Sequence, residues 1–436
     1  IGVGNGSPWN PDIRDPISDG DNLFLSSILA VDADTGEYRW HYQTTPRDRW
    51  DYTATQQITL AHLPLGEGGA DRRVVMQAPK NGFFYVLDAA DGELISATPF
   101  TAQNWTTGEF DENGRPVLIQ DAVDMALTVV IPGPTGAHNW HPMAFNPDTG
   151  LVYIPVNEIP FFYDKTRNVE DSKSFWNLGY DAAAGWPVEY PAGTLDAVAD
   201  LDGGSLLAWD PVKAEPRWAV PFALPLNGGV LSTDAGLVFQ GNKFGDLVAY
   251  DAETGERLWS EQLVGNAAAA PMTYEIDGEQ YLSVLSGWGS LSNLVAGFTY
   301  GQAAGKEPAR VITFKLGGNK MMPAPLADQV VATPKSPIFG EPKQHQLGMQ
   351  RFAENCQFCH GAFAVSGGVI PDLRWSAISA NEQAWDQVLR EGALEKQGMV
   401  AFSGHLTKED TDAIRAYVIQ QAWLAVANGN SSAPGA

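Results

Sequence analysis

One short pattern, repeated over residues 30–260, constrains the fold more than any other feature of the chain. Its copies begin at Ala30 ("AVDADTGEYRW"), Val86, Ala144, Ala208 and Ala249. Each copy reads as a strand that ends in Asp or Asn, a turn, and a second strand. The copies lie roughly 40 to 60 residues apart, which is the period of a four-stranded propeller blade. The pattern predicts an all-β propeller, with a solenoid of another kind as the alternative.

The character of the sequence changes past Gly318. Residues 319–345 are rich in proline and lack periodicity, as expected of a semi-extended linker. Residues 346–424 follow a helical pattern, and residues 425–436 are expected to be a disordered tail. We therefore predict a β-propeller part over residues 1–318, then a linker, and then a small all-α domain.

Two helices of the predicted α domain carry start signals. Ser379 with Glu382 reads as a capping box before one helix, and Gly392 reads as its stop. Thr407 with Asp410 reads as a second capping box, before a helix that continues through "AIRAYVIQQAW".

The composition fits a turn-rich β protein and disfavours two classes of partner. Fourteen tryptophans and 45 glycines accompany only 18% charged residues, which is typical of a well-buried β interior rather than of a disordered chain. The 27 Lys and Arg residues face 52 Asp and Glu, so the formal net charge is -25. Such a charge disfavours a nucleic-acid backbone or an anionic membrane surface as partner.

The sequence predicts no membrane-spanning helix, because it has no run of about 18 apolar residues. It opens at Ile1 with "IGVGNGSPWNP", which has neither the regions of a signal peptide nor an initiator methionine. We therefore expect a fragment that is cut at its N-terminus. The compartment then has to be inferred from chemistry.

The only two cysteines, Cys356 and Cys359, lie in "ENCQFCHG" and are followed directly by His360. In a helical domain this spacing is the attachment signal for haem c, because the two thiols reach the two vinyl groups and the histidine supplies an axial nitrogen to iron. A thioredoxin-like pair would need a βαβ context, and a zinc site would need more ligands than His405 could add. We predict covalent haem c and, because such attachment occurs in the bacterial periplasm, a periplasmic protein.

The second axial ligand of the iron can be argued by elimination. The predicted α domain contains two methionines, Met349 and Met399. Met349 lies in the same predicted helix as the attachment motif, on the wrong side of the haem plane. Met399 lies in a loop between the two capped helices, so it can approach the opposite face. We predict Met399 as the ligand, which would raise the reduction potential relative to a second imidazole, and keep His405 as the rival.

The stretches "SILAVDADTGEYRWHYQTTPRDRWDYTATQ", "MQAPKNGFFYVLD", "GAHNWHPMAFNPDTGLVYIP" and "NGGVLSTDAGLVFQGN", together with the haem domain, carry a resemblance. The chain resembles the pyrroloquinoline quinone (PQQ)-dependent quinohaemoprotein alcohol dehydrogenases over essentially its whole length. The resemblance implies an eight-bladed propeller whose first blades are missing here, with PQQ, Ca²⁺ and haem c as cofactors. It also implies an alcohol substrate and an external electron acceptor such as a soluble cytochrome or copper protein.

The resemblance also assigns roles to particular residues. Asp51 matches the carboxylate that takes the hydroxyl proton, as a base within hydrogen-bond reach would. Lys80 matches the basic residue that contacts the quinone oxygens, where a cation stabilises developing charge. Asn139 and Asn227 match positions near the quinone ring, although Leu226 stands where many relatives have an aromatic residue.

The resemblance bears on the metal as well. Asn5 matches an amide ligand of calcium, a hard cation that takes oxygen ligands, while the matching glutamate would lie upstream of this chain. Thr53 stands where lanthanide-using relatives have a second aspartate, and its hydroxyl favours calcium. Trp288 could line the cavity, although blade packing is the role we favour for it. Two other readings stay open: a dehydrogenase of larger polyol, sugar or polymeric alcohols, and a propeller scaffold that carries an electron-transfer cytochrome.

Overall fold

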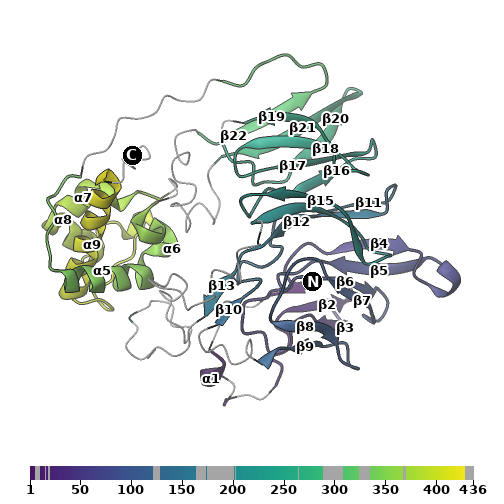
Figure 1. Ribbon diagram of the computed structural model, residues 1–436, viewed down its shortest axis with the longest axis horizontal. Helices are drawn as coiled ribbons and strands as arrows, with labels where there is room; N and C mark the ends of the chain where they lie inside the picture. The colour runs from purple at the N-terminus through teal and green to yellow at the C-terminus, as the bar shows by residue number, and fades with distance from the viewer. Residues whose placement is uncertain are drawn as a thin grey trace.

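The computed structural model places a β part and a helical domain side by side (Figure 1). It describes residues 1–4, 10–14, 16–17, 20–120, 128–163, 173, 201, 203–263, 265–287, 308–323, 334–366 and 370–427. In Figure 1 the sheets of the β part follow one another in chain order, from the N-terminal strands to β22, and the helices that follow residue 341 gather on the opposite side.

In the described part of the chain, three sheets have the four antiparallel strands of a propeller blade, hydrogen-bonded in the order in which they occur. Their strands are β4 (Thr59–Leu63), β5 (Arg72–Gln77), β6 (Phe83–Asp88) and β7 (Leu94–Pro99); β11 (Ala144–Asn146), β12 (Leu151–Asn157), β14 (Gly204–Asp210) and β15 (Glu215–Phe222); and β16 (Val230–Ser232), β17 (Leu237–Gly241), β18 (Asp246–Asp251) and β19 (Arg257–Gln262).

Two further sheets within the described residues have three strands, and they lie before and after the four-stranded ones in the chain. Their strands are β1 (Gly2–Val3), β2 (Ser27–Val31) and β3 (Tyr38–Gln43), and β20 (Met272–Ile276), β21 (Glu279–Ser286) and β22 (Arg310–Lys315). The remaining strands form two short pairs, β8 (Thr106–Phe110) with β9 (Pro116–Leu118) and β10 (Thr128–Val130) with β13 (Phe161–Tyr163). A four-residue helix, α1 (Pro11–Arg14), precedes β2. The predicted all-β propeller architecture is confirmed.

The repeated sequence pattern forms hairpin turns, as expected. In the β2–β3 turn, the Asp32 side chain accepts hydrogen bonds from the backbone N–H groups of Asp34 and Thr35, at 3.1 and 3.0 Å. Asp251 accepts the equivalent bonds in the β18–β19 turn, from Glu253 and Thr254. These side chains replace backbone acceptors at the turn, which is why Asp recurs there.

The tryptophans of the pattern connect neighbouring sheets. Trp40 Nε1 donates to the Ala89 carbonyl, and Trp218 Nε1 donates to the Ala252 carbonyl, both at 3.2 Å. A Cβ added to Gly92 would lie 2.5 Å from the Trp40 ring, so the glycine leaves room for the indole. The recurring Asp, Gly and Trp therefore stabilise both the hairpin and the contact between consecutive blades.

Because neighbouring strands of a blade are antiparallel, the loops that join them lie at two opposite ends of the blade. The turns that join first to second and third to fourth strands, such as those at Asn146 and Asp88, lie at one end. The turns that join second to third strands, and the connections to the next blade, must lie at the other end. We call this second end the loop end. It carries the β5–β6 and β17–β18 turns and the segments before β4, β11 and β16.

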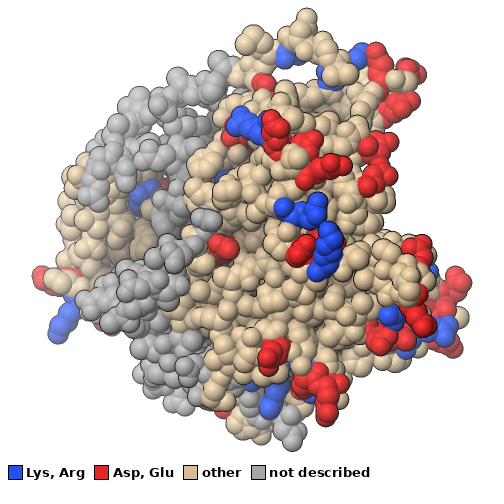
Figure 2. All heavy atoms as spheres, turned by 45° about the vertical axis from the view of Figure 1, so that its right-hand side comes forward, with Lys and Arg blue, Asp and Glu red and all other residues tan. Residues whose placement is uncertain are grey.

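Acidic side chains lie in small groups along the rim of the β part on the face that Figure 2 shows, with basic side chains among them. This distribution agrees with the formal net charge of -25. Within the described residues, none of the helices combines the length and the apolar character that crossing a bilayer needs.

The helical domain is built on two long helices that pack together, α5 (Pro342–Asn355) and α9 (Lys408–Ala427). Shorter helices lie between them: α6 (Gln357–His360), α7 (Ala377–Ala380) and α8 (Glu382–Leu389). α5 begins inside residues 319–345, and the residues after Ala427 lie outside the described part of the chain.

One of the two predicted capping boxes is confirmed and the other is wrong. Thr407 and Asp410 exchange side chain to backbone hydrogen bonds, 2.9 Å from Thr407 N and 3.2 Å from Asp410 N. α8 is capped by Asn381, whose Oδ1 accepts from Ala384 N at 3.0 Å. Ser379 instead belongs to α7, where its hydroxyl donates to backbone carbonyls.

Candidate functional site

Asp51 and Lys80 meet at the loop end of the propeller. Asp51 precedes β4, and Lys80 lies in the β5–β6 turn of the same blade. Lys80 Nζ lies 2.9 Å from Asp51 Oδ2, with 11% and 17% of the two side chains exposed. Gly136 gives the lysine its space, because a Cβ at that position would lie 2.3 Å from Lys80 Cγ. The pair is a charge-assisted hydrogen bond shielded from solvent.

Burial and neighbouring charges set the pKa of Asp51, and therefore its strength as a proton acceptor. Burial raises the pKa of Asp51 to about 6, against the lowering effect of Lys80, and Asp48 adds to the rise. Asp48 is itself buried and accepts hydrogen bonds from the Ser26 hydroxyl and from Trp50 N. A carboxyl group with this pKa is ionised at neutral pH but holds a proton more strongly than an ordinary aspartate, which suits a general base.

Asn139 and Asn227 also lie in loop-end segments, and both are buried. Asn139 Nδ2 donates to Thr135 O at 2.7 Å, and its Oδ1 accepts from Trp140 N. Asn227 Nδ2 donates to Leu224 O at 2.8 Å. In this structure both amides therefore hold the backbone of their own loops, and their contact with a quinone stays a prediction.

The predicted calcium ligand Asn5, and Trp288, for which blade packing is the favoured role, lie outside the described residues. The chain just before Asn5 runs along the Asp51 loop, since Ala54 N donates to Val3 O at 3.3 Å. A Cβ on Gly4 would lie 3.4 Å from Thr53 Cγ2. The calcium assignment of Asn5 stays a prediction, supported by this proximity.

The haem attachment motif occupies the junction of two helices. Cys356 ends α5 and is buried, while Cys359 in α6 is exposed. His360 is buried, and its Nδ1 lies 3.0 Å from the Pro371 carbonyl. A carbonyl only accepts, so Nδ1 carries the proton and Nε2 keeps a lone pair for iron. Burial lowers the pKa of His360, which favours the neutral ring that binds metal.

Met399 and His405 differ in what they contact. Met399 packs against the apolar cluster of the helical domain that contains Cys356 and Phe352. The Nε2 atom of His405 instead forms a hydrogen bond with the backbone carbonyl of Lys173, which belongs to the β part. This arrangement supports Met399 as the iron ligand, which stays a prediction.

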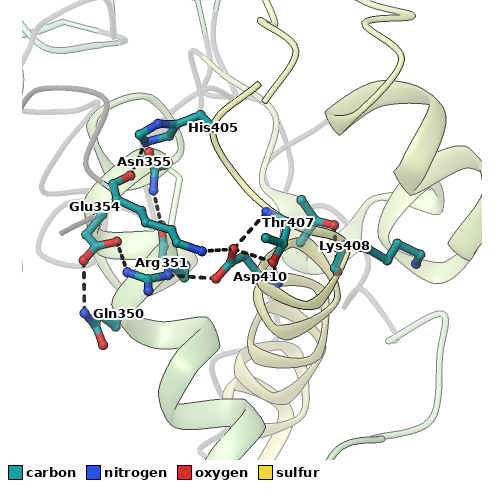
Figure 3. Close-up of polar contacts among 10 residues, drawn as sticks. Gln350, Arg351, Glu354, Asn355, His405, Thr407, Lys408 and Asp410 are labelled. Atoms are coloured by element: carbon teal, nitrogen blue, oxygen red, sulfur yellow. Dashed lines mark hydrogen bonds and ion pairs between the residues drawn. The ribbon is translucent and has the colours of Figure 1, made fainter. Parts of the chain in front are cut away.

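Lys173 also connects the two parts of the chain through its side chain, which reaches the Asp410 carboxylate that Figure 3 shows beside Arg351 and Thr407. Its Nζ lies 2.6 Å from Asp410 Oδ2, and Arg351 Nε donates to the other oxygen of the same carboxylate at 3.0 Å. Burial alone would raise the pKa of Asp410, but the hydrogen bonds from Lys173, Thr407 and Arg351 hold it well below its usual range. Asp410 therefore stays ionised and bonded to both lysine and arginine.

Replacing Lys173 by methionine is expected to loosen the contact between the two parts. A charge-assisted hydrogen bond to a buried carboxylate contributes about 1–2 kcal/mol, so the docked population should fall about tenfold relative to the undocked one. Faster proteolysis within residues 319–345 and a larger radius of gyration by X-ray scattering would record the change. Lys408→Met is the matched control, because the ion pairs of Lys408 stay inside the helical domain.

Sequence reasoning missed several of these residues for different reasons. Pro371 lies eleven positions after His360, and its carbonyl orients the imidazole ring. A search for the carbonyl that fixes the iron-binding histidine could have found it. Nothing in the sequence pattern singles out Lys173 or Gly136, whose roles depend on tertiary contacts.

The comparisons agree with this arrangement of domains. Residues 10–104 and 102–282 match the family described as glucose/ethanol/alcohol dehydrogenase, β-propeller domain. Residues 343–418 match the family described as cytochrome c oxidase, cbb3-type, subunit III. The quinohaemoprotein alcohol dehydrogenase ADH IIB of Pseudomonas putida is 44% identical over 97% of this chain and 59% of its own length. That of Comamonas testosteroni is 40% identical over 96% of this chain and 58% of its own length.

Solved structures give the same result. The quinohaemoprotein alcohol dehydrogenase ADHIIG of Pseudomonas putida superposes with a TM-score of 0.85 at 40% identity, covering 99% of this chain and 63% of that one. The Comamonas testosteroni enzyme gives a TM-score of 0.79 at 38% identity, covering 97% of this chain and 61% of that one. The chain thus spans about three fifths of the length of these relatives. With that propeller family matched over more than half of its residues and a cytochrome match following, the chain belongs to the glucose/ethanol/alcohol dehydrogenase β-propeller family.

Proposed function

We propose that the complete gene product oxidises an alcohol to an aldehyde or ketone with PQQ and Ca²⁺, and then passes the electrons through haem c to an external acceptor. The observation that carries the proposal is the buried pair of Asp51 and Lys80, 2.9 Å apart, in a chain that also holds a haem attachment motif. A soluble cytochrome or copper protein as acceptor, and the periplasm as compartment, are parts of the same proposal.

The donor groups at the loop end fit PQQ. Lys80 offers an ammonium group that is largely shielded from solvent, which is the partner that quinone oxygens need as they gain charge. The glycine at position 136 leaves room for the stem of the lysine side chain that carries this ammonium. Asn5 would supply an amide oxygen to calcium, and Asn139 and Asn227 would border the ring. When bound, the quinone with its metal supplies the acceptor for the substrate's hydride.

Asp51 accepts the hydroxyl proton of the alcohol at Oδ1 or Oδ2. Lys80 orients the carboxylate and keeps it ionised at neutral pH. Trp50, Tyr52 and Trp105 pack together next to the Asp51 backbone, with ring centroids 5.3 to 5.4 Å apart and no exposed surface. This buried aromatic cluster fixes the backbone on either side of Asp51.

The helical domain fits haem c. Cys356 and Cys359 would form the two thioether bonds, His360 would bind iron through Nε2, and Met399 would supply the second iron ligand. When attached, the haem carries electrons singly between the propeller cofactor and the acceptor. Pro371 fixes the tautomer and orientation of His360, which maintains the lone pair toward the metal.

The proposal is tested by reconstituting the complete apoprotein with Ca²⁺ and PQQ and measuring alcohol-dependent dye reduction. We expect stoichiometric PQQ and reduction that requires both additions. A protein that carries haem but binds no PQQ would be the scaffold with an electron-transfer cytochrome, and the enzyme proposal would fall. A panel of short alcohols, polyols, sugars and polymeric alcohols distinguishes the second alternative, a dehydrogenase of larger substrates.

The pH dependence of kcat/KM reports the base directly. With a pKa of about 6, Asp51 is protonated in acid, so activity should rise with pH through a limb near pH 6 and be lost below it. Lys80 lowers the Asp51 pKa, so Lys80→Met should move the limb to higher pH as well as reduce the rate. Stopped-flow rates between pH 4 and pH 9 give the profile, and a limb that Lys80→Met leaves in place would contradict the assignment.

A further inference from the structure

The segment 136–141, which precedes β11, packs against the turn that carries Lys80. Gly136 faces the lysine so closely that an added Cβ would lie 2.3 Å from Lys80 Cγ and 2.7 Å from Lys80 Cα. The next residue, Ala137, donates from its backbone N–H to Lys80 O at 2.9 Å. The position of Lys80 therefore depends on this segment of the next blade as well as on its own turn.

His138 adds a side-chain bridge between the same two parts of the chain. Its Nδ1 lies 2.6 Å from Ala78 O, two positions before Lys80, and its Nε2 lies 2.7 Å from His141 O, two positions after Asn139. The imidazole is fully buried. One ring thus connects the turn that positions Lys80 with the loop that positions Asn139.

Both contacts of the ring are with carbonyl oxygens. A carbonyl only accepts a hydrogen bond, so the nitrogen that faces it must carry a proton. Burial lowers the pKa of His138, against the raising effect of the two carbonyls, so the neutral ring with one N–H predominates at neutral pH. The ring therefore donates to one carbonyl at a time, and the form with the proton on Nδ1 is the one that holds the turn at Ala78.

A further bond holds the far side of the Lys80 turn. Trp105 Nε1 donates to Asn81 O at 3.0 Å, and this bond does not involve His138. Replacing His138 should therefore shift the turn rather than unfold it. A shift of the Lys80 backbone would change the 2.9 Å contact of Lys80 Nζ with Asp51.

We propose that His138 is a positioning residue of the candidate site, whose Nδ1 holds the Lys80 turn at Ala78. Through this bond the histidine sets the place of Lys80 relative to Asn139. It contacts neither substrate nor cofactor in this role, and it acts on the Asp51 carboxylate only through Lys80. The inference rests on the proposed function and deepens it.

Three variants of the complete gene product test the role. His138→Leu removes both contacts of the ring. In His138→Asn the amide nitrogen stands near the place of Nδ1, so the bond to Ala78 can be kept. In His138→Gln the amide nitrogen stands near the place of Nε2, so the bond to His141 can be kept while that to Ala78 is lost.

Asn146→Leu is the matched control. Asn146 is also buried, and its Nδ2 donates to Ser232 Oγ and to Thr233 O, both at 3.0 Å, at the end of the propeller opposite to Lys80. Thermal melting of the apoproteins gives the effect of each change on the fold. The PQQ dissociation constant, measured by fluorescence, and the pH profile of kcat/KM give the effect on the site.

We expect His138→Leu to weaken PQQ binding about tenfold and to lower kcat by up to about a hundredfold, since a displacement of about 1 Å in a site can lower the rate that far. Lys80 lowers the pKa of Asp51, so a displaced Lys80 lowers it less, and the acid limb should move to higher pH. His138→Gln should show the same shift, whereas His138→Asn should keep the limb near its native place. Asn146→Leu should lower the melting temperature but keep the limb and the PQQ affinity.

A pH limb and a PQQ affinity in His138→Leu that match those of Asn146→Leu would make His138 a purely structural residue and overturn the proposal. If His138→Leu does not fold, the asparagine and glutamine variants decide, and equal limbs, or a native limb in the glutamine variant alone, would overturn it. Failure of the native protein to bind PQQ would overturn the proposed function together with this role. A native protein that binds PQQ and oxidises alcohol, with no difference among the His138 variants, would overturn the role of His138 alone.

Discussion

Replacing Asp51 by asparagine in the complete gene product is expected to lower kcat for alcohol oxidation by about three orders of magnitude, with PQQ and haem content unchanged. General bases of this kind contribute roughly 10²- to 10⁴-fold. Asparagine has the same shape, and its amide oxygen still accepts the hydrogen bond that Lys80 donates at 2.9 Å. The substitution thus removes the proton acceptor while preserving the packing of the site, so the loss should appear in kcat rather than in cofactor binding.

Asp32→Asn is the matched control for this variant. Asp32 is an aspartate of the same propeller that lies in a hairpin turn at the opposite end of its blade, and asparagine can keep its two turn hydrogen bonds. We expect native turnover from it. If Asp51→Asn turns over within a factor of about three of the control, Asp51 is not the base. The proposal that the protein is an alcohol dehydrogenase could still stand.

The hairpins of the propeller were predictable because their causes are local. An Asp or Asn whose side chain accepts from backbone N–H groups two and three positions later stabilises its turn wherever it occurs, as at Asp32 and Asp251. The capping box of α9 was predictable for the same reason. The box at Ser379 failed because Asn381, two residues later, is an equally good cap, and a separate short helix uses the serine hydroxyl.

The candidate site was less accessible to sequence reasoning because its parts come together only in the folded propeller. The sequence separates Asp51 from Lys80 by 29 positions, and strand pairing within one blade brings them into contact. Family resemblance supplied this pair. The docking contact of Lys173 has no local signature at all.

Replacing Met399 by alanine is expected to lower the haem reduction potential by on the order of 0.1 V and to change the haem absorption spectrum. Axial ligands set haem potentials over a range of about 0.8 V, and a thioether stabilises the reduced iron relative to an imidazole or water. Met399 packs on the cluster that contains Cys356, so its loss should act at the iron with little effect on the propeller. Single-turnover reduction of the quinone by alcohol should stay close to native.

The variant His405→Ala distinguishes the two candidate iron ligands. Loss of an iron ligand changes the haem spectrum, whereas loss of a residue that does not bind iron leaves the spectrum unchanged. The Nε2 atom of His405 is bonded to the Lys173 carbonyl, so its removal should leave the haem spectrum unchanged and instead loosen the contact between the two parts of the chain. Spectroelectrochemistry gives the potential, and X-ray scattering gives the separation of the parts. An unchanged spectrum in Met399→Ala together with an altered one in His405→Ala would transfer the axial position to the histidine. The docking contact would then have to break whenever the iron is ligated, since one nitrogen cannot serve both.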